Sequence, residues 1–74
     1  MQNRVITLTI DLVLIEIYSS LVPLFMEYPQ FLEHKNRIEK SLSKLKEPYE
    51  FRNENNLVVK IERRVIVTKH NVNQ

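Results

Sequence analysis

The chain has 74 residues, of which 43% are hydrophobic and 27% charged, with a formal net charge of +2 and no glycine, cysteine or tryptophan. Without cysteine it has no disulfide, thiolate zinc site or thiol nucleophile, and without glycine it lacks the phosphate and dinucleotide loops in which backbone closely approaches phosphate. A chain of this size buries only ~60% of its unfolded surface, so we expect a single domain over residues 1–74 that self-associates.

The most apolar stretch, residues 5–25, contains Asp11 and Glu16 and has Pro23 near its end. A membrane-spanning helix needs about twenty apolar residues without internal charge. The N-terminus also lacks the small-residue cleavage site of a secretory signal. We therefore expect no membrane segment and a cytoplasmic location.

Residues 5–18 favour a strand, because nine of these fourteen residues are β-branched or aromatic and apolar positions alternate. The pattern predicts one long strand that ends near Ile17. The alternative ends the strand at Ile10 and starts a helix capped by Asp11, because later apolar residues also fit helical spacing. We favour the long strand, since a continuous helix would place Pro23 well inside it at a cost of ~3 kcal/mol.

Two helical segments are expected next. Ser19 and Ser20 can cap a helix with Pro23 in an early turn, and Pro29 then ends or kinks it. Residues 30–46 form the clearest amphipathic helix of the chain, because apolar residues recur at offsets of seven, four and three. These residues are Phe31, Ile38, Leu42 and Leu45.

The C-terminal third reads as two strands joined by a turn. Pro48 stops the helix and residues 49–52 form a short strand. Residues 53–56 form a turn that uses asparagine in place of glycine, because asparagine tolerates the left-handed backbone conformation. Residues 57–70 alternate between apolar and polar side chains without a turn signal, which predicts one strand of about a dozen residues.

These segments predict an α+β fold with a small antiparallel sheet, two long strands and one or two helices packed against it, in the order β-α-α-β-β. Both long strands exceed the usual five or six residues. In so small a chain such strands bend or reach over a second subunit, so we expect a homodimer or higher oligomer. The candidate interface residues are Leu12, Leu14, Phe25, Tyr28 and Phe31.

Positive charge is concentrated in the second half of the chain, where residues 33–74 have an excess of +4. Basic residues form one stripe on the amphipathic helix and another on the last strand. Such stripes can neutralise phosphates, but acidic residues are interleaved with them, so a solvated surface is the simpler interpretation. The candidate contacts to nucleic acid or a protein partner are Arg37, Lys40, Lys44, Lys60, Arg64 and His70.

Glu16 and Arg63 interrupt the apolar faces of the two long strands. A buried charge needs a partner of opposite sign, so one interpretation pairs these two side chains. The other is that both strands leave the core at these points. The sequence leaves both open.

No motif in the chain indicates catalysis. His34 and His70 do not have the spacing of metal ligands, and no serine lies in a recognisable nucleophile motif. We therefore expect no cofactor or metal, and a small non-enzymatic interaction protein that binds a further protein, in an accessory or inhibitor role of the kind found in phage and mobile elements. The alternative is a protein that binds DNA or RNA through the basic helix and last strand.

Overall fold

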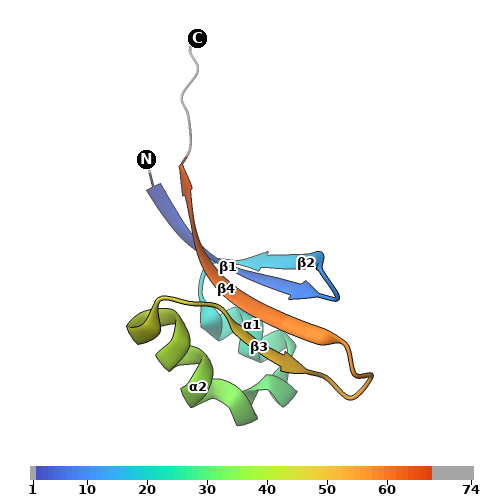
Figure 1. The fold of residues 1–74 in the computed structure, drawn as a ribbon. Helices are drawn as coiled ribbons and strands as arrows, with labels where there is room; N and C mark the ends of the chain where they lie inside the picture. The colour runs from blue at the N-terminus through green and yellow to red at the C-terminus, as the bar shows by residue number, and fades with distance from the viewer. Residues whose placement is uncertain (1, 68–74) are drawn as a thin grey trace.

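The computed structural model describes residues 2–67, with side chains for residues 4–65. Within these residues, four antiparallel strands form one open sheet, and two short helices lie on one of its faces in an α+β fold (Figure 1). The strand order is β2-β1-β4-β3, so β1 and β4 are central and β2 and β3 form the edges. The elements are β1 (Gln2–Ile10), β2 (Val13–Tyr18), α1 (Leu21–Glu27), the 3-10 segment η1 (Pro29–His34), α2 (Lys35–Lys40), the π-helical segment η2 (Ser41–Leu45), β3 (Tyr49–Arg52) and β4 (Val58–Val67).

The first part of the chain differs from the prediction. There is no single strand over residues 5–18, because β1 ends at Ile10 and the chain reverses through Asp11 and Leu12 into β2. The two turn residues have φ of 52° and 69°, and positive φ at both positions is what a two-residue type I′ hairpin turn requires. The alternative prediction, a strand that ends at Ile10 and a helix capped by Asp11, is right about the end of the strand. It is wrong about the helix, because β2 follows. The observed order is therefore β-β-α-α-β-β and not β-α-α-β-β.

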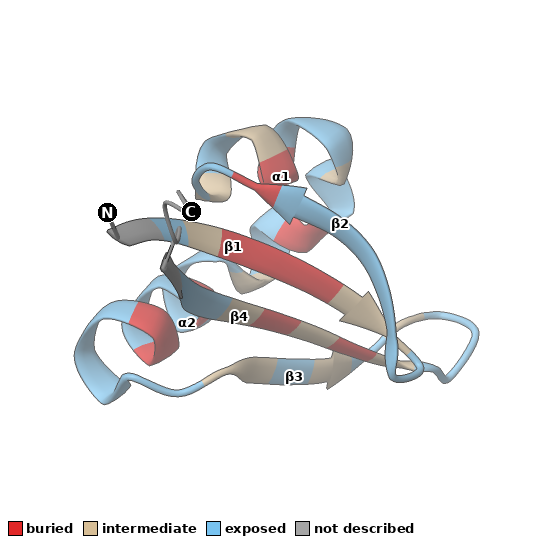
Figure 2. Cartoon of the chain, turned by 90° about the horizontal axis from the view of Figure 1, so that it is seen from above, coloured by how far each residue is buried: buried red, intermediate tan, exposed pale blue. Residues whose placement is uncertain are grey.

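β2 contains a β-bulge where it pairs with β1. Leu8 lies opposite Glu16 and Thr9 lies opposite Leu14, so Ile15 is the extra residue on β2. A bulge bends a strand and increases its twist. In Figure 2, β2 runs back toward α1 as an exposed strand, and only its last residue is buried.

The helical segments lie where the sequence predicts them. α1 begins after Ser20, whose extended backbone fits an N-cap although its side chain makes no capping hydrogen bond. The helix predicted over residues 30–46 consists of η1, α2 and η2 in succession. Three of its four expected core residues are buried, but Leu45 is 53% exposed, because a π turn contains more residues than an α turn and moves that position away from the buried face. None of the helices in the described residues is long and apolar enough to cross a membrane.

The core lies between the helical layer and the middle of the two central strands. Leu8 of β1 lies opposite Ile61 of β4, and both side chains are completely buried. Figure 2 shows buried segments on the helices, on β1 and β4, and at the end of β2. The hairpin and the first residues of β1 therefore extend beyond the core. The buried apolar residues are Ile6, Leu8, Tyr18, Leu24, Phe25, Phe31, Ile38, Leu42, Val59 and Ile61.

The C-terminal hairpin confirms the prediction. β3 covers residues 49–52, and β4 is a single strand of 10 residues. In the turn between them, Asn56 has φ of 63°, and Asn53 Oδ1 accepts two backbone N–H groups at 2.9 and 3.0 Å. Asparagine therefore provides the left-handed residue for which glycine is the usual choice. Residues 68–70 of the predicted strand lie outside the described residues.

The structure also decides between the two interpretations of Glu16 and Arg63. Both side chains are exposed. None of the ion pairs found in the described part of the chain joins them. The two strands therefore leave the core at these residues.

Candidate functional site

The open edge of the sheet at β2 is strongly apolar. Within residues 2–67, β2 pairs with β1 alone, so the backbone N–H and C=O groups on its outer side have no strand partner there. Around it five large hydrophobic side chains are between 43% and 91% exposed. A monomeric protein rarely exposes a continuous apolar surface, so such a surface indicates an interaction site. These five residues, which we call the hairpin patch, are Leu12, Val13, Leu14, Ile15 and Ile17.

The hairpin patch is exposed on both faces because the helical layer stops short of it. α1 contacts β2, and the contact includes Tyr18 at the end of the strand. The Tyr18 side chain is buried and its hydroxyl donates a hydrogen bond to Glu27 Oε1 of α1. Burial, together with this hydrogen bond, raises the pKa of Tyr18 above its ordinary value. Tyr18 therefore anchors one end of β2, while the other residues of the strand are exposed.

β2 has few of the features that protect edge strands from pairing with other chains. Natural edge strands use lysine, proline or inward-pointing charges for this purpose. The strand contains one charged residue, Glu16, which is exposed. The bulge at Ile15 twists the edge but leaves the outer side of β2 open.

The predicted interface residues occupy two different places. Leu12 and Leu14 belong to the hairpin patch. Phe25 and Phe31 instead lie in the core, and Tyr28 is half-buried with its ring stacked on Phe31 at a centroid distance of 5.0 Å. Phe25 and Phe31 are therefore internal to the subunit.

The prediction missed three members of the hairpin patch, namely Val13, Ile15 and Ile17. The prediction places them in one long strand with alternating apolar positions. A signal was present in the sequence, because residues 12–15 are four consecutive hydrophobic residues without a polar alternate. Such a run leaves no polar face for solvent once the strand lies at an edge.

The predicted basic contacts do not form one surface. Val59 and Ile61 of β4 face the helices, so by alternation Lys60 and Arg64 project from the opposite face. Glu62 Oε1 lies 3.9 Å from Lys60 Nζ and 3.3 Å from Arg64 Nε, which partly neutralises that stripe.

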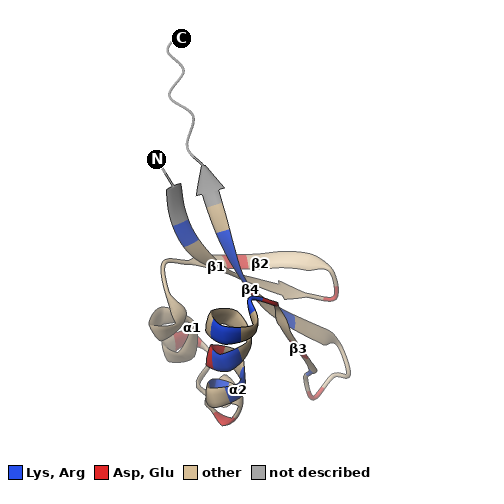
Figure 3. Cartoon of the chain, turned by 60° about the vertical axis from the view of Figure 1, so that its left-hand side comes forward, with Lys and Arg blue, Asp and Glu red and all other residues tan. Residues whose placement is uncertain are grey.

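The helical stripe lies on the other side of the sheet, along the outer side of α2 and η2 (Figure 3). Lys40 and Lys44 are exposed. Arg37 contacts His34 on the same side of the molecule. His70 lies outside the described residues. The sheet therefore separates the helical contacts from those on β4.

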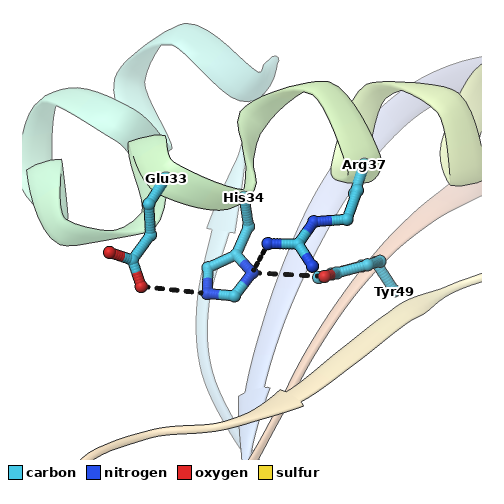
Figure 4. Close-up of polar contacts among 4 residues, drawn as sticks. All are labelled: Glu33, His34, Arg37 and Tyr49. Carbon is cyan, nitrogen blue, oxygen red and sulfur yellow. Dashed lines mark hydrogen bonds and ion pairs between the residues drawn. The ribbon is translucent and has the colours of Figure 1, made fainter.

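His34 is the centre of a polar cluster between η1, α2 and β3 (Figure 4). Its Nδ1 lies 3.2 Å from Arg37 Nη2 and 3.2 Å from Tyr49 Oη. Because a guanidinium only donates hydrogen bonds, Nδ1 acts as an acceptor and Nε2 carries the proton. Nε2 then donates to Glu33 Oε1 at 3.4 Å. Because Nδ1 of His34 already accepts hydrogen bonds from two side chains, the arrangement does not resemble an activated catalytic base. These contacts instead hold η1 and α2 against β3.

A hollow of about 370 Å³ adjoins this cluster. Its wall includes the rings of Tyr28, Phe31 and Phe51, and His34 is stacked on Phe51 at a centroid distance of 4.2 Å. Glu33, Arg52 and Glu54 contribute polar groups to the lining. No group of three or more potential metal ligands occurs among the described residues.

Neither a known protein family, nor a curated protein, nor a solved structure shows significant similarity to this chain.

Proposed function

We propose that this protein is a protein-interaction module that works as a homodimer, in which the β2 strands of two subunits pair along their open edges. The observation that supports the proposal is the hairpin patch, where exposed hydrophobic side chains surround a strand edge that no other described strand pairs with. Pairing would satisfy the outer backbone groups of β2 and join two four-stranded sheets into one. It would also remove apolar surface from water, which contributes about 25 cal/mol per Å².

A second copy of the chain is the occupant that fits this edge best. β2 contains no basic residue and one acidic residue, so it offers little to a strongly charged partner. A small domain without disulfides gains most from a partner that adds to its core. Self-pairing also buries the same patch on both subunits, as a two-fold interface requires.

The charge of Glu16 restricts the register of this pairing. An antiparallel register centred on Glu16 would place two carboxylates opposite each other, and directly opposed like charges are destabilising. A register centred on Leu14 or Ile15 instead places apolar residues opposite each other at the two-fold axis. We therefore expect one of these two registers.

Such a dimer would present two copies of the aromatic hollow beside His34. Repeated surfaces increase the avidity for a partner that is itself repeated. An accessory or inhibitor role for the dimer is in keeping with this arrangement. The division of the basic residues between opposite faces, and the pairing of two of them with Glu62, make nucleic-acid binding the weaker proposal.

The test is the solution mass of the protein by light scattering after size exclusion. We expect twice the chain mass for the wild type and the chain mass for Leu14→Lys, because residue 14 lies at or next to the two-fold axis in both expected registers and a lysine there blocks edge pairing. The matched control is Leu32→Lys on η1, where the leucine is 49% exposed compared with 55% for Leu14. This variant should remain dimeric.

A monomeric wild type at the highest soluble concentration would contradict the proposal. Equal dissociation of the Leu14 and Leu32 variants would place the interface elsewhere. Far-ultraviolet circular dichroism shows whether each variant is folded. The ultraviolet absorbance ratio of the eluting peak tests the alternative, because bound nucleic acid raises it.

A further inference from the structure

Two arginines lie in the part of the sheet beyond the helices. Each occupies a strand position where the alternating pattern would place an apolar residue. On β1, Arg4 occupies the face of Ile6 and Leu8, and on β4, Arg63 occupies the face of Val59 and Ile61. The register pairs Ile6 with Arg63, so the two arginines are diagonal neighbours on adjacent strands. Neither arginine contributes to the core.

Both arginines are exposed, and none of the ion pairs in the described part of the chain involves either one. Figure 3 shows basic segments on β1 and β4 beyond the helical layer. Two neighbouring guanidinium groups repel each other. An anion bound between them would remove this repulsion and accept their N–H groups.

A hollow of about 230 Å³ lies beside the two arginines. Besides the guanidinium groups, two serine side chains contribute to its wall, and no carboxylate does. Ser20 makes no side-chain capping hydrogen bond to α1, so its hydroxyl is available to a ligand. The lining residues are Arg4, Val5, Ile6, Ser19, Ser20 and Arg63.

We propose that this hollow binds a phosphate group, either as the free ion or as a small phosphomonoester. Guanidinium groups match the geometry of phosphate oxygens through paired hydrogen bonds, and hydroxyl donors can reach the remaining oxygens. The site lies on the helix-facing side of the sheet and is distinct from the basic residues of α2 and from Lys60 and Arg64. It does not depend on dimer formation.

The test is a titration of the protein with sodium phosphate at constant ionic strength, followed by two-dimensional NMR. We expect saturable shifts of the Arg4 and Arg63 side-chain Nε–H signals and of the Ser19 and Ser20 amides. A parallel titration with O-phosphoserine distinguishes the sources. Tighter binding of the monoester indicates a phosphorylated small molecule, and tighter binding of phosphate indicates the free ion.

Arg4→Gln and Arg63→Gln should each weaken binding about tenfold or more, the usual effect of removing a hydrogen bond to a charged group. The matched control is Arg64→Gln, because this arginine lies on the same strand but on the opposite face and is paired with Glu62. It should bind phosphate like the wild type. The Leu14→Lys variant should also bind normally, which separates this proposal from that of the dimer.

Two results would overturn the proposal. One is the absence of saturable shifts at these four residues in the wild-type protein, a result that does not depend on the folding of any variant. The other is an equal loss of affinity in Arg63→Gln and Arg64→Gln, which would indicate a general attraction of anions to a basic protein.

Discussion

Tyr18 attaches the β1–β2 hairpin to the helical layer. The ionisation of its phenol makes this attachment sensitive to pH. The ring is buried and the hydroxyl donates to the Glu27 carboxylate. A phenolate at this position would lose hydration and face a second negative charge. For these reasons the folded protein holds the Tyr18 proton more tightly than the unfolded chain does.

This difference predicts a loss of stability in alkaline solution. The phenol of the unfolded chain ionises near pH 10, whereas the pKa of Tyr18 in the folded protein is higher. The contribution of the phenol to the free energy of unfolding is therefore complete below about pH 10 and declines above it. Urea unfolding of wild type and Tyr18→Phe between roughly pH 8 and pH 11 checks this.

We expect Tyr18→Phe to be less stable than the wild type near neutral pH by about 1 kcal/mol, the usual contribution of one hydrogen bond. The difference should shrink as the pH rises, since the variant lacks the ionising group. Parallel curves for the two proteins over the whole range would contradict this account of Tyr18.

At the level of elements, the reversal through Asp11 and Leu12 is the least typical feature of the fold. Positive φ is unfavourable for a bulky residue by about 1–2 kcal/mol, yet Leu12 has φ of 69°. Its side chain is 91% exposed, so burial within the subunit does not offset this cost. Asp-Gly is the sequence that a type I′ turn favours.

Leu12→Gly should therefore raise the free energy of unfolding by about 1 kcal/mol. The measurement is a urea titration in the Leu14→Lys background, so that association does not contribute. Leu12→Ala is the control, because it removes the same exposed side chain but keeps the cost of positive φ. If alanine stabilises the protein as much as glycine, the effect comes from the lost leucine side chain and not from the backbone.

At the level of the whole molecule, dimerisation and folding should be coupled. A process that binds only folded chains stabilises them by mass action. We expect the Tm of the wild type to rise by several degrees for about a hundredfold increase in protein concentration. Leu32→Lys should behave in the same way, whereas the Tm of Leu14→Lys should be independent of concentration. Differential scanning calorimetry provides the comparison, and a constant Tm for the wild type would argue against the dimer.

The local patterns of the sequence determined the α+β class, β3, β4, the turn that uses Asn56 and the position of the helical segments. These features depend on the conformational preferences of neighbouring residues and on the spacing of apolar positions. Both act over a few residues and can be read without knowledge of the rest of the chain.

Only the tertiary structure decided where apolar and charged side chains lie. Apolar alternation continues through Asp11 and Leu12, so it did not distinguish one long strand from a hairpin, and pairing with β1 decided between them. Phe25 and Phe31 lie inside because the helices fold onto the two central strands. Arg4 and Arg63 are 59 residues apart in the sequence and become neighbours through the register of β1 and β4. Each of these outcomes depends on contacts between distant residues, which a local pattern does not contain.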